Sequence, residues 1–179
     1  MKVFMFLRIL LFLLGILALI MLPSLIMAAA FKEAPMIRAF ALTMGLALAA
    51  AIPSLFSRKK IPLRFSSWNG FFLVTLTWLL ISLMGAIPYY LAGMGISFTD
   101  AFFESACGFA TTGGTTIFDI EVLPRSLLFW RAMTHWFGGM GIILLTVALM
   151  PLFGVGGFQL IKAETPGPEK EKITPKITA

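Results

Sequence analysis

The sequence predicts an all-α integral membrane protein. We expect two N-terminal transmembrane helices, then one repeat made of a membrane helix, a half-length helix, a loop and a second membrane helix. Of the 179 residues, 59% are hydrophobic and 12% are charged, whereas a soluble domain carries about 25% charged residues. Four apolar runs have the length of about 20 residues that a helix needs to cross a bilayer. A run rich in glycine and threonine, 107–116, lies between the last two of them.

The two N-terminal spans are expected within residues 1–56. The first apolar run, 9–31, follows a basic start. A cleaved signal peptide with a small-residue site at 28–30 is the alternative for this segment. The run is longer than the usual apolar part of a signal peptide, and further spans follow, so we interpret it as a retained helix. The second span is expected at 36–56.

A basic loop is expected at 57–67, where four lysines and arginines occur without any acidic residue. The positive-inside rule places such a loop in the cytoplasm. With two spans before it, the N-terminus is then cytoplasmic as well. The net charge of +6 is therefore interpreted as a signal of topology, and not as affinity for nucleic acid.

The repeat is expected over residues 68–153, with membrane helices at 68–91 and 126–153, and the tail at 154–179 returns to the cytoplasm. The pair Tyr89-Tyr90 ends the first of these helices. Amphipathic rings prefer the membrane–water interface, so we expect both tyrosines to lie there.

The segment between these two helices is acidic and should face the outside. Residues 93–124 contain no lysine or arginine and four acidic residues, namely Asp100, Glu104, Asp119 and Glu121. Such an acidic vestibule raises the local concentration of cations; the alternative is that acidic residues are merely tolerated on the outer side. Arg131, near the start of the last helix, is expected to pair with Glu104 or Asp119, or to reach the interface.

A half-length helix is expected at about 98–108, capped by Ser97 or Thr99. Asp100 then lies in its first turn, where a carboxylate complements the helix dipole. A helix of about 11 residues is roughly 16 Å long, which is half a bilayer. We expect Glu104, on this helix, to anchor the loop that follows and not to touch ions.

The loop at 110–114, read Ala110-Thr111-Thr112-Gly113-Gly114, is the candidate binding site. Cation filters replace the hydration shell of the ion with rings of carbonyl oxygens. Successive carbonyls face one axis only if the backbone adopts dihedrals that L-residues disfavour, and Gly113 supplies that freedom. The alternative is a surface turn, but the flanking half-length helix and two spans favour a cation filter.

Catalysis is not expected. The single cysteine, Cys107, excludes an internal disulfide and a cysteine metal cluster. The single histidine, His135, makes a histidine-based catalytic or zinc site a poor hypothesis, and packing or a hydrogen bond is its expected role. No nucleophile–base pair is visible, so we predict neither an enzyme nor a cofactor.

Several long motifs resemble one family. They are FFESACGFATTGG at 102–114, LPRSLLFWR at 123–131, THWFGGMGI at 134–142, GVGGFQL at 154–160 and AETPGP at 163–168. Together they closely resemble the TrkH/TrkG-type potassium uptake proteins of the Trk/Ktr/HKT superfamily, and the resemblance is dense over about residues 60–176.

The resemblance implies potassium uptake across the bacterial inner membrane through a filter like that of a potassium channel. Members arrange four such repeats around a pore, and each repeat supplies one filter strand. The strand here is Ala110 to Gly114, and the carbonyls of Thr111 and Thr112 are the first choice as potassium ligands. The resemblance also implies a homo-oligomer, a dimer in the family, and a cytosolic ring of nucleotide-binding regulatory subunits.

One repeat is visible where the family has four. One repeat alone cannot enclose a pore, so the remaining repeats are expected on another chain or are missing through truncation, and assembly of several copies is a further alternative. The rival function is a non-conducting membrane fragment, or a partner of a full-length transporter.

Overall fold

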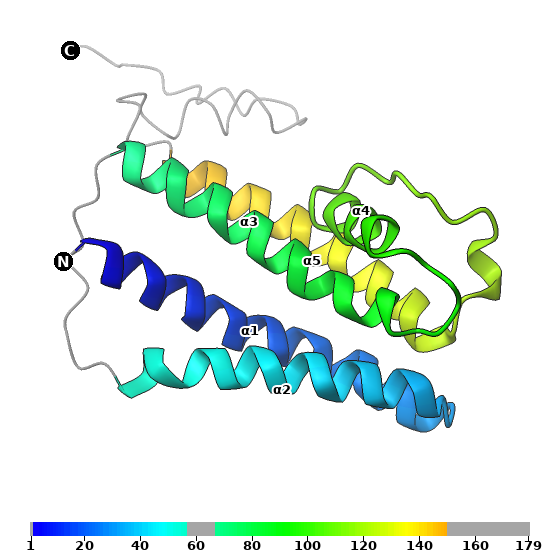
Figure 1. Cartoon of the computed structure of the whole chain (residues 1–179). Coiled ribbons are helices and arrows are strands. Elements are labelled where there is room, and N and C mark those ends of the chain that lie inside the picture. The colour runs from blue at the N-terminus through cyan, green and yellow to red at the C-terminus, as the bar shows by residue number, and fades with distance from the viewer. Residues whose placement is uncertain (1, 57–66, 150–179) are drawn as a thin grey trace, which may run out of the picture.

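The protein is described here in a computed structural model that covers residues 2–56 and 67–149, with side chains at 6–54 and 70–143. The expected basic loop at 57–67, apart from its last residue, and the expected tail at 154–179 lie outside these ranges. The described chain forms four long helices, one short helix and one 3-10 turn (Figure 1). They are α1 (Lys2–Ala30), α2 (Ala34–Phe56), α3 (Ser67–Tyr90), α4 (Phe98–Phe109), η1 (Ile120–Val122) and α5 (Arg125–Leu149).

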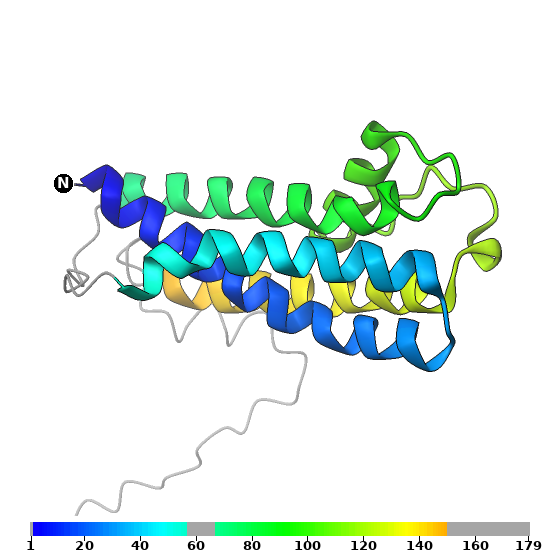
Figure 2. The ribbon, with the colours of Figure 1, turned by 60° about the horizontal axis from the view of Figure 1, so that its bottom comes forward.

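The four long helices run along one another in alternating directions (Figures 1 and 2). One end of the bundle therefore holds the α1–α2 turn, the end of α3 and the start of α5. The short helix α4 lies near that end, against α3 and α5. The loop from α4 to α5, with η1 in it, returns to the same end of the bundle.

Three of the described helices are long and apolar enough to cross a membrane, over Phe6–Ala30, Ala34–Ser54 and Gly70–Tyr90. The fourth long helix, α5, has 25 residues but is not among them. Its first half carries Arg125, Arg131 and His135, which lower the hydropathy of the helix. The expected fourth span thus exists as a helix of sufficient length, while its crossing of the membrane stays a prediction.

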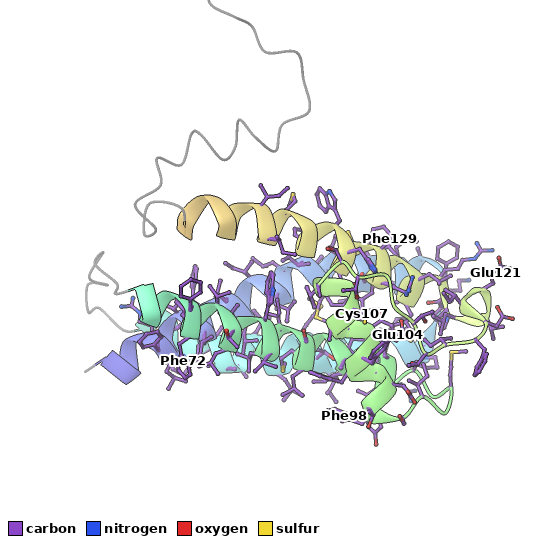
Figure 3. The ribbon with its side chains drawn as sticks, turned by 90° about the horizontal axis from the view of Figure 1, so that it is seen from above. Phe72, Phe98, Glu104, Cys107, Glu121 and Phe129 are labelled. Atoms are coloured by element: carbon purple, nitrogen blue, oxygen red, sulfur yellow. The ribbon has the colours of Figure 1, made fainter. Side chains whose placement is uncertain are left out.

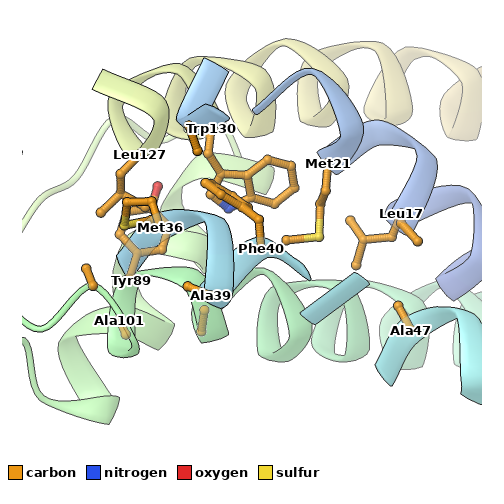
Figure 4. Packing of buried hydrophobic residues seen from close by; sticks show 14 of the residues in the cluster. Leu17, Met21, Met36, Ala39, Phe40, Ala47, Tyr89, Ala101, Leu127 and Trp130 are labelled. Atoms are coloured by element: carbon orange, nitrogen blue, oxygen red, sulfur yellow. The ribbon is translucent and has the colours of Figure 1, made fainter. Parts of the chain in front are cut away.

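The buried core joins the N-terminal pair of helices to the repeat (Figure 4). Trp130 of α5 is fully buried and its ring stands edge-on to Phe40 of α2, at 6.3 Å between centroids, and to Phe109 of α4, at 6.2 Å. The indole N–H of Trp130 donates to the carbonyl of Gly85 in α3, at 3.1 Å. One aromatic side chain therefore fixes four helices at a single point.

The tyrosine pair at the end of α3 does not lie as the sequence predicts. Tyr90 is exposed, but Tyr89 is fully buried in the same core. Adjacent residues on a helix point about 100° apart, since 3.6 residues make a turn, so the two rings cannot share one environment. Only Tyr90 is on the surface, where its ring meets Phe98 of α4 at 6.0 Å between centroids.

Candidate functional site

Helix α4 begins at a defined cap. The hydroxyl of Ser97 accepts a hydrogen bond from the backbone N–H of Asp100, at 3.1 Å, and donates one to the Asp100 carboxylate, at 2.5 Å. Serine at this position satisfies an N–H group that has no partner within the helix. Of the two caps that the sequence allows, Ser97 is confirmed, and Asp100 lies in the first turn as expected.

Helix α4 ends in a left-handed turn whose central residue is Thr111. Its N–H donates to the carbonyl of Gly108, at 3.0 Å, and the N–H of Thr112 donates to that of Cys107, at 3.1 Å. These two bonds define a Schellman cap, which normally places glycine at the left-handed position. Thr111 has a φ of 56° there, and a β-branched residue with positive φ is an outlier. The turn stops the helix where the candidate loop starts.

The two glycines of the loop are needed for different reasons. Gly113 has a φ of 72°, and a Cβ added to it would meet nothing within 4 Å, so glycine is needed there for its backbone conformation. A Cβ on Gly114 would lie 3.1 Å from the Cys107 sulfur and 3.4 Å from the Phe103 ring. The positive φ expected at Gly113 is confirmed, whereas Gly114 is needed for close approach to α4.

The loop presents unpaired carbonyl oxygens. Ala110, Thr111, Thr112 and Gly113 are exposed, and Gly114 is half-buried. Among the backbone groups of 2–56 and 67–149 and the side chains of 6–54 and 70–143, none donates a hydrogen bond to the carbonyl oxygens of 110–114. Backbone carbonyls are strong acceptors that seek a partner when water is excluded, so five acceptors are available here to something outside the described chain.

A buried carboxylate ties α4 to α5 and to the chain that follows the loop. Glu104 is 1% exposed. One of its oxygens lies 3.2 Å from Nε of Arg131 in α5. The other accepts hydrogen bonds from the Thr115 hydroxyl, at 2.6 Å, and the Thr116 N–H, at 2.7 Å. Arg131 thus pairs with Glu104, not Asp119, and the contacts of Glu104 are those expected of a residue that anchors the loop.

The C-terminal end of α4 reaches well along α5. A Cβ on Gly138 would collide with the backbone of Phe109, and one on Gly108 would collide with the side chain of Thr134. The two helices touch here backbone to backbone because both positions lack a side chain. At 1.5 Å per residue, Gly138 lies about 20 Å along α5 from Arg125. Ring contact with Tyr90 places the other end of α4, at Phe98, beside the end of α3.

The remaining acidic residues hold local structure. Asp119 caps η1, since its side chain accepts from the N–H of Glu121 at 3.1 Å. Both are exposed, and Glu121 lies at the end of the bundle, far along it from Glu104 and Cys107 (Figure 3). Asp100 contacts Ser97 at the start of α4. The structure thus separates these carboxylates among three places, and the vestibule predicted for them stays a prediction.

His135 has a partner close to the site. Its Nδ1 lies 2.9 Å from the carbonyl oxygen of Arg131, one turn earlier in α5. This hydrogen bond requires the proton to be on Nδ1, because a carbonyl can only accept. It agrees with the structural role expected from the sequence.

Two contributors were missed by reasoning from the sequence. Glu33, in the turn between α1 and α2, accepts hydrogen bonds from the N–H groups of Arg125 and Ser126, at 2.8 and 3.2 Å, and from the Ser126 hydroxyl. Trp130 joins four helices. The first turn of α5 contains no carboxylate of its own. This was the sequence signal that a carboxylate from elsewhere in the chain, here Glu33, caps the helix.

Comparison with known proteins identifies the family of this chain. Residues 35–178 match the TrkH family, described as cation transport protein. The Trk system potassium uptake protein TrkH of Escherichia coli strain K12 is 44% identical over 142 residues, which are 78% of this chain and 29% of that protein. The TrkH protein of Halomonas elongata is 39% identical over 180 residues, covering 97% of this chain and 36% of the relative.

A solved structure has the same fold. The crystal structure of the potassium transporter TrkH from Vibrio parahaemolyticus superimposes with a TM-score of 0.79 at 34% identity, covering 91% of this chain and 36% of that one. The chain spans about a third of the length of the relatives that it matches over most of its own length.

Proposed function

Because the chain belongs to the TrkH family of cation transport proteins, we propose that it forms one repeat of a potassium uptake protein and that the carbonyls of 110–114 coordinate the ion. In this proposal α4 is a pore helix and the loop is one strand of a selectivity filter. The membrane-capable helices of the chain and the curated potassium uptake relatives support the broader part of this proposal.

One observation supports coordination of the ion by the loop: other contacts hold the loop in place, and its carbonyls accept no hydrogen bond from the described chain. A filter must offer oxygens in place of the hydration shell, and those oxygens must not be taken by hydrogen bonds within the protein. The Schellman turn at Thr111 and the anchor from Glu104 to Thr115 and Thr116 satisfy the N–H groups on either side. The carbonyls of 110–114 have no hydrogen-bond donor within the described part of the chain.

The depth of the α4 end also supports a filter. Its contact with Gly138 lies about 20 Å along α5, and the hydrocarbon core of a bilayer is about 30 Å thick. If α5 crosses the membrane, Phe109 and the loop after it lie within the bilayer. Non-helical backbone is tolerated there only when it is buried in protein or lines a water-filled cavity. The C-terminal end of α4 carries a partial negative charge that favours a cation nearby.

The proposed topology puts the α1–α2 turn, η1 and the start of α5 outside the bacterial inner membrane and both termini in the cytoplasm. Completion of the pore requires further repeats, on another chain or in continuation of this one. A homodimer and a cytosolic nucleotide-binding regulatory subunit are proposed partners on the strength of the family alone. Reporter fusions after residues 33, 60 and 120 test the topology, and a cytoplasmic signal from residue 120 would contradict it.

The function is tested by growth on low potassium in bacteria that lack their own uptake systems. The chain is expressed with a second chain that carries the later repeats of a relative, and radioactive rubidium uptake is measured. We expect rescue only when both chains are present. Failure of rescue, with both chains in the membrane, would favour the rival function of a non-conducting fragment or partner.

The role of the loop is tested by Gly113→Val, with Gly95→Val as the matched control. Both glycines have a φ near 70°, and an added Cβ meets nothing at either, so both substitutions impose similar backbone strain. We expect Gly113→Val to abolish uptake or to lower selectivity for rubidium over sodium, while Gly95→Val leaves both unchanged. Normal uptake and selectivity in Gly113→Val would count against coordination by this loop.

A further inference from the structure

Glu33 holds the start of α5 from a position 92 residues earlier in the chain. Both of its carboxylate oxygens are used: one accepts from the N–H of Arg125, and the other accepts from the N–H and hydroxyl of Ser126. The first N–H groups of a helix lack partners within it, and a negative charge at that end is stabilised by the helix dipole. The α1–α2 turn therefore supplies the cap that α5 lacks in its own sequence.

The turn that carries Glu33 is hydrogen-bonded to both helices that it joins. The N–H of Glu33 donates to the carbonyl of Ala28 in α1, at 2.9 Å, and its carbonyl accepts from the N–H of Ile37 in α2, at 3.0 Å. The guanidinium of Arg125 lies over the ring of Phe31, at 4.8 Å from its centroid, a favourable cation–π contact. Glu33 is thus fixed to two long helices on one side and to α5 on the other.

From Ser126, α5 leads directly to the anchor of the candidate filter. Arg131 lies less than two turns further along the helix and pairs with Glu104. Glu104 accepts the two hydrogen bonds from Thr115 and Thr116 that fix the end of the loop. A slide or rotation of α5 would move Arg131 relative to Glu104, and side-chain networks of this kind are sensitive to the loss of any one member.

We propose that Glu33 is a positioning residue for the filter: by capping α5 it sets where Arg131 holds Glu104, and so where 110–116 presents its carbonyls. This assigns to the N-terminal helix pair a part in ion selection. The proposal rests on the proposed function, because a selectivity effect requires that the loop coordinate the ion. Its structural half, the coupling of Glu33 to the loop, can be tested without transport.

The structural test is amide hydrogen exchange on the purified chain in detergent. The variant is Glu33→Gln, which removes the charge and places an amide N–H₂ against N–H donors. The control is Arg38→Gln, which removes an exposed charge from the same helix pair. We expect exchange about tenfold faster at Arg125 and Ser126 in Glu33→Gln, as for loss of a charge-assisted hydrogen bond, and a smaller acceleration at Thr116. Exchange in the middle of α2 and α3 reports that the variant is folded.

Faster exchange at Arg125 and Ser126 with no change at Thr116 would show that Glu33 is a local cap only, and would overturn the proposal. No change at any of the three positions would overturn it as well. Because these readouts need no ion flux, they judge the coupling even if the chain fails to restore uptake with the later repeats.

The functional test is the ratio of rubidium to sodium uptake by the assembled transporter. We expect Glu33→Gln to lower this ratio severalfold, Glu33→Asp to restore part of it because a carboxylate is kept, and Arg38→Gln to leave it unchanged. Equal loss of rubidium and sodium uptake, with the ratio preserved, would mean that Glu33 affects only the amount of folded protein, and the proposed positioning role would be wrong.

Discussion

The α1–α2 pair and the α4 segment of the repeat are held together in different ways. The buried side chains of α1 and α2 include the apolar Leu17, Met21 and Ala47, and one hydrogen bond, from Arg8 Nε to the Ser54 carbonyl at 3.2 Å, also joins the two helices. The α4 segment is held by single directional contacts, among them the Glu104 cluster, the Schellman turn and the glycine contact at Gly138. The first kind of packing tolerates exchange of one residue by another of similar volume, whereas the second depends on particular atoms.

The contacts that depend on particular atoms lie around the loop for which we propose a function. A pair of helices needs only compatible volumes in order to associate, so many sequences can satisfy it. A loop whose carbonyls accept no hydrogen bond from the described chain must be fixed by other groups.

The largest effect is expected from Glu104→Ala. It leaves Arg131 without its partner and the donors of Thr115 and Thr116 without an acceptor, and breaking a buried ion pair costs about 3–5 kcal/mol. Ser24→Ala is the control in α1, because Ser24 is also fully buried but its hydroxyl has no partner among the described residues. Thermal unfolding in detergent should show a large loss for Glu104→Ala and little change for Ser24→Ala; similar losses would contradict the comparison.

The next effect is expected from Gly138→Val. Its side chain would overlap the backbone of Phe109, which cannot rotate away, and forcing extra volume into a packed site costs about 1–3 kcal/mol or more. Gly45→Val in α2 is the control, since a Cβ there meets nothing within 4 Å. Folded yield and melting temperature should fall for Gly138→Val and stay unchanged for Gly45→Val. Equal tolerance at both sites would show that α4 and α5 do not need this contact.

A smaller effect is expected from Ser97→Ala, which removes the N-cap of α4. Loss of such a cap costs about 1 kcal/mol. Amide exchange at Asp100 should become faster, while exchange at Thr111 and Thr112, at the other end of the helix, stays slow. If both ends of α4 loosen together, the anchors at its C-terminal end are weaker than their geometry indicates.

The smallest effect is expected from Thr111→Gly. Glycine adopts the left-handed conformation without the strain that a β-branched residue has there, but it also gains freedom in the unfolded chain. The two terms oppose each other, so stability should change by less than about 1 kcal/mol, and the carbonyl is kept. A large loss of stability would show that the threonine side chain, and not the backbone turn, terminates α4.

Local patterns allowed much of this arrangement to be predicted from the sequence. Apolar runs indicate long helices, a serine before an acidic residue indicates the start of α4, and glycine indicates the positive φ at Gly113. The positions of the charged residues indicated Glu104 as one of two possible partners for Arg131, the other being Asp119. These features depend on residues close together in the chain or on a charge that requires a partner.

Other features could not be predicted, because they depend on long-range geometry. The cap from Glu33 reaches Arg125, 92 positions later in the chain. The sequence shows only that the first turn of α5 has no carboxylate of its own, and not which distant residue supplies one. The left-handed turn was expected at glycine, but Thr111 also adopts it, since the Schellman bonds and the anchored loop determine its conformation. Burial of Tyr89 depends on where α2 and α5 pack against α3, which hydropathy alone does not indicate.

Coordination of the ion by the 110–114 loop is tested directly by locating the ion in an assembly of this chain with the later repeats. A structure of this chain with the later repeats, determined with thallium or rubidium present, would give ion density by anomalous scattering. We predict density in direct contact with carbonyl oxygens of 110–114, the loop lying within the bilayer and facing the pore axis. Ion density elsewhere along the pore, with 110–114 turned toward lipid or bulk water, would contradict the account.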